Sequence, residues 1–208
     1  QVPLYHHVRP YQDPHPPIAV AGLHKASESL FTAGEQGWIP MSINYLPAVN
    51  LITHWEAVCA GAKKAGRPVP SRSSWRIARE VYVAKTDQEA RDHVLNGPIA
   101  AAYTDYMYNI LRSLGAVDLY KDDPDMPDEA LTAEYVCDKI WIVGSPDTVA
   151  SKLEKLYNDV GGFGTVLQIQ YTYEPFQQWK DNMQLFAREV MPGLKHLVPD
   201  EATSVAAQ

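Results

Sequence analysis

Cysteine, basic clusters and long apolar runs are all scarce in this sequence. Its two cysteines, Cys59 and Cys137, have the spacing of neither a disulfide framework nor a metal site, so we expect two reduced, buried thiols. No apolar run approaches the roughly 20 residues that span a bilayer, and no signal peptide is visible. A net charge of -7 without basic clusters argues against nucleic acid and anionic membranes as partners. We therefore expect a globular, cytoplasmic protein.

Motifs of several common site types are also missing. The glycine run at 161–164 lacks the spacing of a dinucleotide or phosphate loop, so it is interpreted as a helix stop. The seven histidines form no metal set, and His54, beside Trp55 in a helical pattern, is expected to be packed rather than catalytic. The acidic cluster at 122–125 lacks the EF-hand pattern and is expected to be a solvated loop. We therefore expect no metal.

Short apolar runs alternate with helical patterns along most of the chain. The patterns predict four buried strands, at residues 18–22, 37–43, 76–84 and 165–170. Pro40 lacks the donor that a sheet requires, which favours an irregular end to the second strand. Alternation of this kind predicts a parallel sheet with right-handed crossovers. Four βα units are half of a (β/α)8 barrel.

The same patterns divide the chain into three parts. Residues 1–17 are rich in proline and histidine and are interpreted as a loop. Residues 18–195 carry the alternation, with a helical and acidic insertion at about 96–139. Residues 196–208 form a tail, which we expect to be disordered after Asp200.

Three stretches carry a family likeness in their order and spacing. These are PHPPIAVAG at 14–22 with AGEQGWIPMS at 33–42, WIVGSPDTVASKLEKLYNDVGGFGTVLQIQ at 141–170, and NMQLFAREVMPGL at 182–194. Together they resemble luciferase-like flavin-dependent monooxygenases, nearest to the limonene and alkanal monooxygenase-like branch, over residues 9–195. The resemblance implies a TIM-type (β/α)8 barrel of the bacterial luciferase-like type. This chain would supply about the last four βα units, its C-terminal half.

The resemblance also implies a two-component enzyme of the cytoplasm. It would use reduced FMN, or FAD, and O2 to oxidise a small apolar organic substrate through a C4a-hydroperoxyflavin, with the flavin supplied by a flavin reductase. A homodimer is implied as well. The acid or base of relatives lies on the early strands, so the catalytic residues are expected on the missing N-terminal half and this chain alone is expected to be inactive. Two alternatives stay open: a non-catalytic barrel half or subunit with a structural role, and a deazaflavin (F420)-dependent oxidoreductase of the same superfamily.

The turn after the first strand is the expected cofactor site. Backbone N–H groups at a helix N-terminus favour a phosphate, and hydroxyl groups can add donors. We expect the flavin phosphate site to include Gly22, Leu23, His24, Ser27 and Ser29. Ser27 has a second interpretation, in which it only caps the helix. His24 and Lys25 replace the Ser-Pro that relatives often have, so either the mode of phosphate contact is altered or the site is weakened.

The end of the second strand is expected to complete the site. Met41, Ser42 and Asn44 would face the flavin ring or the substrate, with a place in the core as the alternative for Met41. Aromatic side chains either line an apolar substrate pocket or belong to the core. They are Tyr103, Tyr106, Tyr108, Tyr171, Tyr173 and Phe176.

Overall fold

A parallel sheet organises the computed structural model, which describes residues 10–172 and 174–197. Its strands are β1 (Ala19–Gly22), β2 (Ile39–Ser42), β3 (Arg76–Val83), β4 (Ile142–Gly144) and β5 (Thr165–Ile169). β1 pairs with β2 and β2 with β3, while β3 pairs with β5 along its first part and with β4 along its last part. Every one of these pairings is parallel, so the α/β architecture expected from the alternation is confirmed.

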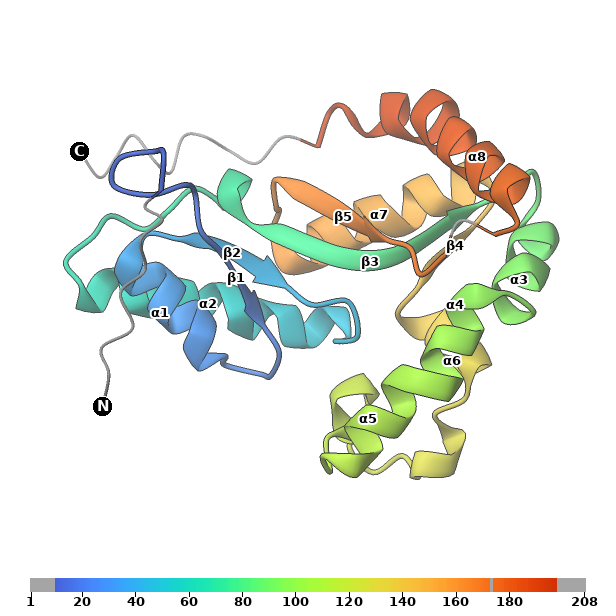
Figure 1. The fold of residues 1–208 in the computed structure, drawn as a ribbon, viewed down its shortest axis with the longest axis horizontal. Helices are drawn as coiled ribbons and strands as arrows, with labels where there is room; N and C mark the ends of the chain where they lie inside the picture. Colours follow the sequence, from blue (N-terminus) through green and yellow to red (C-terminus); the bar gives the residue numbers. More distant parts are fainter. Residues whose placement is uncertain (1–9, 173, 198–208) are drawn as a thin grey trace.

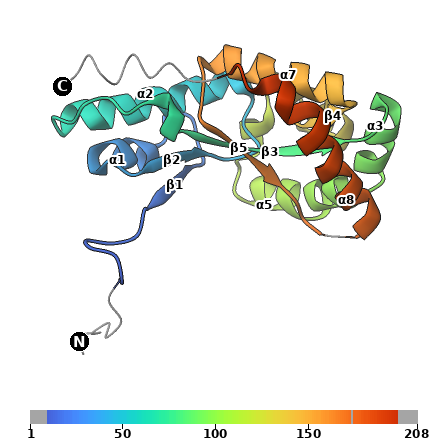
Figure 2. The same cartoon turned by 90° about the horizontal axis from the view of Figure 1, so that it is seen from above.

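Helices connect the strands and cover the sheet. They are α1 (Glu28–Gln36), α2 (Ala48–Lys64), α3 (Asp87–Leu95), α4 (Pro98–Ala101), α5 (Tyr108–Ser113), α6 (Ala133–Lys139), α7 (Pro146–Val160) and α8 (Phe176–Leu185). A π-helical segment, η2 (Ala102–Met107), joins α4 to α5, and a second, η5 (Phe186–Val190), extends α8. α2 and α7 lie along the same side of the strands (Figure 2).

The sequence predicts four strands, and the described part of the chain has five. The missed strand is β4, which is three residues long and pairs only with Val81, Tyr82 and Val83 of β3. A run this short has no period that could be recognised in the sequence. The other four strands form within two residues of their predicted bounds. Pro40 is paired on the β1 side, and pairing with β3 begins one residue later at Met41, so its missing N–H costs no bond to β3.

Alternation along β3 separates a helix-facing side from an inner side. Trp75, just before the strand, stacks on Trp55 of α2 with 5.4 Å between ring centroids. Ile77 and Val81 have the same parity and are fully buried. Because successive side chains point to opposite faces, Ala78 and Glu80 belong to the inner side, which would face the lumen of a barrel.

Two glycines let α1 and α2 pack with their backbones almost in contact. A Cβ added at Gly34 would lie 2.1 Å from the carbonyl oxygen of Val58, and one added at Gly61 would lie 1.9 Å from that of Phe31. No side chain larger than hydrogen fits at such distances. The close approach fixes α2 against α1, which matters below because α2 holds the turn that precedes α1.

The two outer strands of the sheet each have an edge with no strand against it in the described part of the chain. β1 pairs with β2, and β5 pairs with β3. Most residues of both strands are partly or fully exposed. Unpaired N–H and C=O groups on an edge strand are a template for another strand. The sheet is therefore open in the described part of the chain, with free edges on β1 and β5.

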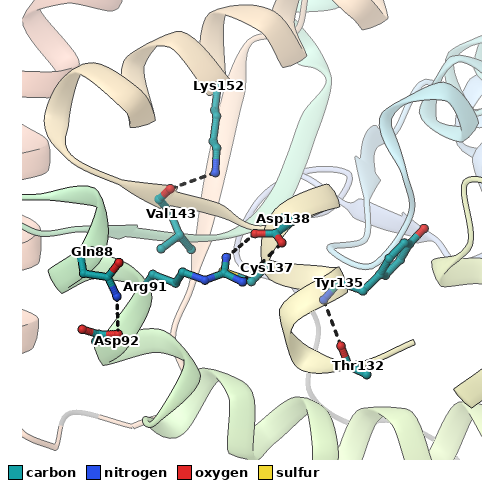
Figure 3. Close-up of polar contacts among 9 residues, drawn as sticks. All are labelled: Gln88, Arg91, Asp92, Thr132, Tyr135, Cys137, Asp138, Val143 and Lys152. Atoms are coloured by element: carbon teal, nitrogen blue, oxygen red, sulfur yellow. Dashed lines mark hydrogen bonds and ion pairs between the residues drawn. The ribbon is translucent and has the colours of Figure 1, made fainter. Parts of the chain in front are cut away.

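The helical insertion forms a lobe below the carboxyl end of β3 (Figure 1). Its last helix, α6, is joined to α3 by an ion pair between Arg91 and Asp138, and the same guanidinium lies 3.9 Å from the Sγ of Cys137 (Figure 3). Lys152 of α7 donates to the carbonyl oxygen of Val143 at 3.0 Å, which ties α7 to β4. The lobe is thus anchored to the sheet beside β4.

Several smaller expectations can also be compared with the structure. Cys59 is half-buried and Cys137 is buried, and both are free. α7 ends at Val160 and Gly161 follows with a φ of 77°, so the helix stop is confirmed. None of the described helices is long and apolar enough to cross a membrane. The predictions for residues 1–9 and for the end of the tail lie outside the described residues.

Candidate functional site

The candidate site lies where the parallel strands end. β1 ends at Gly22 and β2 at Ser42, which are partners in the sheet register, so the loops after both strands leave the same edge. Side chains on the loops that follow parallel strands form the active face of such sheets. Two features meet at this edge: the turn between β1 and α1, and a buried polar cluster after β2 and along β3.

The turn between β1 and α1 is held in place by α2. Ala26 adopts a left-handed conformation with φ of 48°, and its N–H donates to the Oγ1 of Thr53 at 3.0 Å. The Nε2 of His54, the next residue of α2, lies 2.8 Å from the carbonyl oxygen of His24. Two adjacent residues of one helix therefore determine the path of the turn.

His54 belongs to a relay whose donors can be assigned. The carbonyl oxygen of His24 only accepts, so Nε2 carries the proton and Nδ1 accepts from the hydroxyl group of Ser42 at 2.9 Å. The Oγ of Ser42 in turn accepts from the Nε1 of Trp75 at 2.9 Å. Burial lowers the pKa of His54, although its bond to His24 acts in the opposite direction. The neutral ring satisfies every group in the relay, so His54 is a packed and hydrogen-bonded residue, as expected.

Ser27 sits at the N-terminus of α1 without capping it. Its side chain makes no capping hydrogen bond, although only 7% of the residue is exposed. The Oγ of Ser29 donates to the carbonyl oxygen of Ala21 at 2.7 Å, so the hydroxyl group of Ser27 is the donor in the 2.9 Å contact between the two serines. The second interpretation of Ser27, a side-chain cap, is therefore not what the structure has. Ser29 ties the helix to β1, and a contact from the hydroxyl group of Ser27 to a ligand would replace its bond to Ser29.

The remaining residues of the turn are exposed. Leu23, His24 and Lys25 all have open side chains, and Gly22 is buried. A Cβ at Gly22 would lie 2.4 Å from the Cδ1 of Leu30, so the residue type is set by packing as well as by any ligand. Lys25 is exposed two residues before the N-cap position of α1, and the N–H groups of Glu28 and Ser29 in the first turn precede the first backbone hydrogen bond of the helix, which the N–H of Leu30 donates.

The end of β2 corrects one sequence expectation. Met41 is paired with Ala21 and Arg76 and shares their side of the sheet, which is the inner side. Ser42 is fully buried and bonded to His54 and Trp75 on the helix-facing side. Because neighbours in a strand point to opposite faces, Ser42 does not face a ligand in the lumen. It acts on the turn only through His54.

A buried charged pair on β3 was missed in the sequence. Arg79, 2% exposed, points to the helix side and donates to the carbonyl oxygens of Asn44 at 3.1 Å and Leu46 at 2.7 Å. Burial lowers the pKa of Arg79 to about 10. Glu80, 3% exposed, points to the inner side. Adjacent charges inside a strand that otherwise reads as apolar are the signal that could have drawn attention to it.

Glu80 gathers two partners from distant parts of the chain. Its Oε1 accepts from the Nδ2 of Asn44 at 2.5 Å and from the hydroxyl group of Tyr171 at 2.6 Å. Asn44 thus lies beside Glu80 on the inner side. Of the other aromatic candidates, Tyr103 is buried in the core, Tyr106 and Phe176 are exposed, and Tyr173 lies outside the described residues.

The two largest pockets described next lie away from both the turn and Glu80. One of about 520 Å³ is on the helix side, between α2 and α7, and one of about 630 Å³ is in the helical lobe. An open sheet presents its inner side as a face and not as an enclosed cavity. Within residues 10–172 and 174–197, no three His, Cys, Asp or Glu side chains gather as metal ligands.

Comparison with known proteins identifies a family whose sequence model matches this chain. A family model described as luciferase-like monooxygenase matches residues 3–162. The chain is 35% identical to a 3,6-diketocamphane 1,6-monooxygenase of Pseudomonas putida, over 88% of this chain and 48% of the relative. It is 24% identical to a limonene 1,2-monooxygenase of Rhodococcus erythropolis, over 90% of this chain and 46% of the relative. The chain thus spans about half the length of the curated relatives that it matches.

A solved structure shows the same arrangement. It is a type II Baeyer–Villiger monooxygenase, the oxygenating constituent of 3,6-diketocamphane monooxygenase from the CAM plasmid of Pseudomonas putida, in complex with FMN. The TM-score is 0.79 at 34% identity, over 90% of this chain and 50% of that chain.

Proposed function

Since the chain belongs to the luciferase-like monooxygenase family, we propose that it forms half of a barrel that binds FMN and oxygenates a small apolar ketone. Reduced flavin would supply two electrons, so that one atom of O2 enters the substrate and the other leaves as water. The relatives' names support the substrate class, since they include monooxygenases of diketocamphanes. A flavin reductase and a second copy of the enzyme are the partners that we propose.

The turn before α1 is the observation that carries this proposal. The first-turn N–H groups of α1, the hydroxyl group of Ser27 and the ammonium group of Lys25 offer donors and positive charge at one place. A phosphate suits that combination, because a helix N-terminus attracts anions and its N–H groups point at the ligand. Met41 and Ala21, on the inner side next to the turn, would contact the flavin ring.

The chain's own part in the reaction is to bind and orient. α2 holds the turn through Thr53 and His54, and Ser29 holds the start of α1 to β1. The two free strand edges would pair with the other half of the barrel, which would close the lumen and exclude water from it. We propose that this chain alone is catalytically incomplete, and that the general acid or base lies on the complementing half.

A comparison of FMN with riboflavin tests the phosphate turn. In the assembled barrel, Ser27→Ala should weaken FMN binding about ten- to a hundredfold, because a hydrogen bond to a charged group contributes about 1.5–3 kcal/mol. Riboflavin lacks the phosphate, so its affinity should not change. Ser113→Ala, at an exposed serine of α5, is the matched control. Equal losses of affinity for both flavins, or no loss for FMN, would show that the phosphate does not bind at this turn.

Mixing the assembled barrel with reduced FMN, O2 and a cyclic ketone tests the reaction class. Formation of a lactone, with incorporation of labelled oxygen from O2, supports the proposal. Absence of any flavin binding would favour the structural barrel half. Reduction that proceeds only with the deazaflavin would favour the F420-dependent oxidoreductase.

A further inference from the structure

Glu80 has a buried carboxyl group in which only one of the two oxygens is hydrogen-bonded to described residues. Both of its hydrogen bonds, from Asn44 and from Tyr171, end on Oε1. Oε2 is buried and has no hydrogen-bond partner among the described residues. Buried polar atoms are nearly always bonded, so an orphan of this kind calls for a specific explanation.

The bonding pattern indicates where a proton would sit. If Glu80 were ionised, Oε2 would be part of a buried negative charge with no donor, which is the costlier state. If Glu80 is neutral, Oε1 is the carbonyl oxygen that accepts two bonds and Oε2 carries the proton. A neutral Glu80 thus has one unused donor, and that donor needs an acceptor.

The position of Glu80 indicates what the acceptor could be. Glu80 is on the inner side of β3, and its register partner on β5 is Ile169, two residues before Tyr171. Asn44 lies two residues after the end of β2, at the edge where β1 leads into the proposed phosphate turn. Tyr171 is 38% exposed, whereas Asn44 and Glu80 are 8% and 3% exposed, so Tyr171 is the side of the cluster that a ligand would approach.

We propose that Glu80 is a ligand-contacting residue whose neutral carboxyl group donates a hydrogen bond from Oε2 to a carbonyl oxygen of the bound ligand. Asn44 and Tyr171 hold the carboxyl group by donating to Oε1, so that the proton is directed to the other oxygen. The carbonyl oxygen belongs either to the flavin ring or to a ketone substrate. The proposal rests on the function proposed above, in which the inner side of this sheet faces the flavin.

The titratable groups around Glu80 agree with a neutral carboxyl group. Burial raises its pKa, while the bonds from Tyr171 and Asn44 and the charge of Arg79 lower it. Tyr120, from the loop segment η3 (Val117–Tyr120), also faces the cluster, and burial raises its pKa. Burial likewise raises the pKa of Tyr171. The positive charge of Arg79 lies on the opposite side of the strand, where its guanidinium group donates hydrogen bonds to backbone carbonyl oxygens.

Infrared difference spectroscopy on the assembled barrel tests the proton directly. The carbonyl stretch of a protonated carboxyl group should be present at neutral pH in the ligand-free protein and absent from Glu80→Gln. Glu56→Gln, at an exposed carboxylate of α2, should leave the band unchanged. If the ligand-free protein has no such band, Glu80 is ionised and the proposal fails.

Titration with ligands then identifies the acceptor. A shift of the band on adding oxidised FMN alone assigns the flavin carbonyl, and a shift only on adding cyclohexanone to the FMN complex assigns the ketone. A band that moves with neither ligand overturns the contact. Since FMN affinity is measured separately by the riboflavin comparison, failure of the contact is distinguishable from failure of flavin binding.

Two substitutions of Glu80 distinguish a neutral carboxyl group that donates a hydrogen bond from an ionised carboxylate. Glutamine keeps an oxygen for Asn44 and Tyr171 and an N–H donor in place of Oε2–H, so Glu80→Gln should weaken binding of the assigned ligand less than Glu80→Ala does. For the alanine variant we expect a loss of about tenfold. Equal losses in the two variants would refute a neutral donor. A change in the unfolding midpoint without any change in ligand affinity would show that Glu80 is only structural.

Discussion

His54 offers a test of how the fold positions the turn, because its two nitrogens do different things. Nε2 holds the carbonyl oxygen of His24 in the turn, and Nδ1 accepts from the buried hydroxyl group of Ser42. Asparagine has an amide that reaches the position of Nδ1, and glutamine has one that reaches the position of Nε2. His54→Asn should therefore release the turn, and His54→Gln should keep it.

The expected magnitudes follow from which group loses its partner. A backbone hydrogen bond contributes about 0.5–1.5 kcal/mol net, so release of the turn in His54→Asn should weaken FMN binding about two- to tenfold. In His54→Gln the hydroxyl group of Ser42, fully buried, loses its acceptor. That loss should cost about 1–3 kcal/mol of the free energy of unfolding while FMN affinity stays near the parent value.

The assay is an FMN titration beside a denaturant unfolding curve for each variant, with riboflavin as the ligand that lacks the phosphate. Thr53→Ala, which removes the acceptor for the N–H of Ala26, should behave like His54→Asn. If the asparagine and glutamine variants bind FMN equally well, α2 does not position the turn and the reasoning is refuted.

The remaining predictions concern packing, buried charge and pH. Gly34→Ala should lower the free energy of unfolding by about 1–3 kcal/mol, because its Cβ would lie 2.1 Å from a backbone carbonyl oxygen of α2; Gly193→Ala, with nothing within 4 Å, should have little effect in the same denaturation assay. Arg79→Met should cost about 2 kcal/mol or more, since it leaves buried carbonyl oxygens without donors, whereas Arg112→Met at an exposed site should be close to neutral. The pKa of His54 is lowered in the folded protein, so as the pH falls the histidine is protonated in the unfolded chain before it is protonated in the folded one. The contribution of His54 to the free energy of unfolding should therefore be full above about pH 6.5 and should decrease below that pH. Denaturation curves of the parent and His54→Gln across this range should converge as the pH falls.

Much of the fold could be predicted from local patterns, because each of the longer elements carries its own signal. The strand before Gly22 and the helix that Gly37 ends both have their stop signals next to them in the sequence. β4 could not be predicted in this way, since three residues become a strand only through their pairing with β3. The orientation of Ser42 was out of reach for a related reason: alternation shows that neighbours face opposite sides, and only the packing of α2 shows which side is which.

The buried cluster shows why the site was harder to predict than the fold. Glu80 and Tyr171 are 91 positions apart, and Asn44 is 36 positions from Glu80 on the other side. Asn44 and Tyr171 each follow the end of a strand as ordinary polar residues, and the charge of Glu80 inside β3 does not reveal its partners. Only the parallel register, with β5 and β2 on β3, brings them to one place.

The turn is supported from the helix side of the sheet and the Glu80 cluster lies on its inner side, and that difference has a consequence. The turn is held from the helix side through His54 and Ser42, so its geometry is complete within this chain. Glu80 faces the inner side, where Oε2 has no partner among the described residues and where β1 and β5 each have an edge that no described strand pairs. Phosphate binding at the turn should therefore depend on α2 and little on the other half of the barrel. The contact from Glu80 should depend on barrel closure. Adding the complementing half should therefore shift the infrared band of Glu80 and leave the ratio of FMN affinity to riboflavin affinity nearly unchanged.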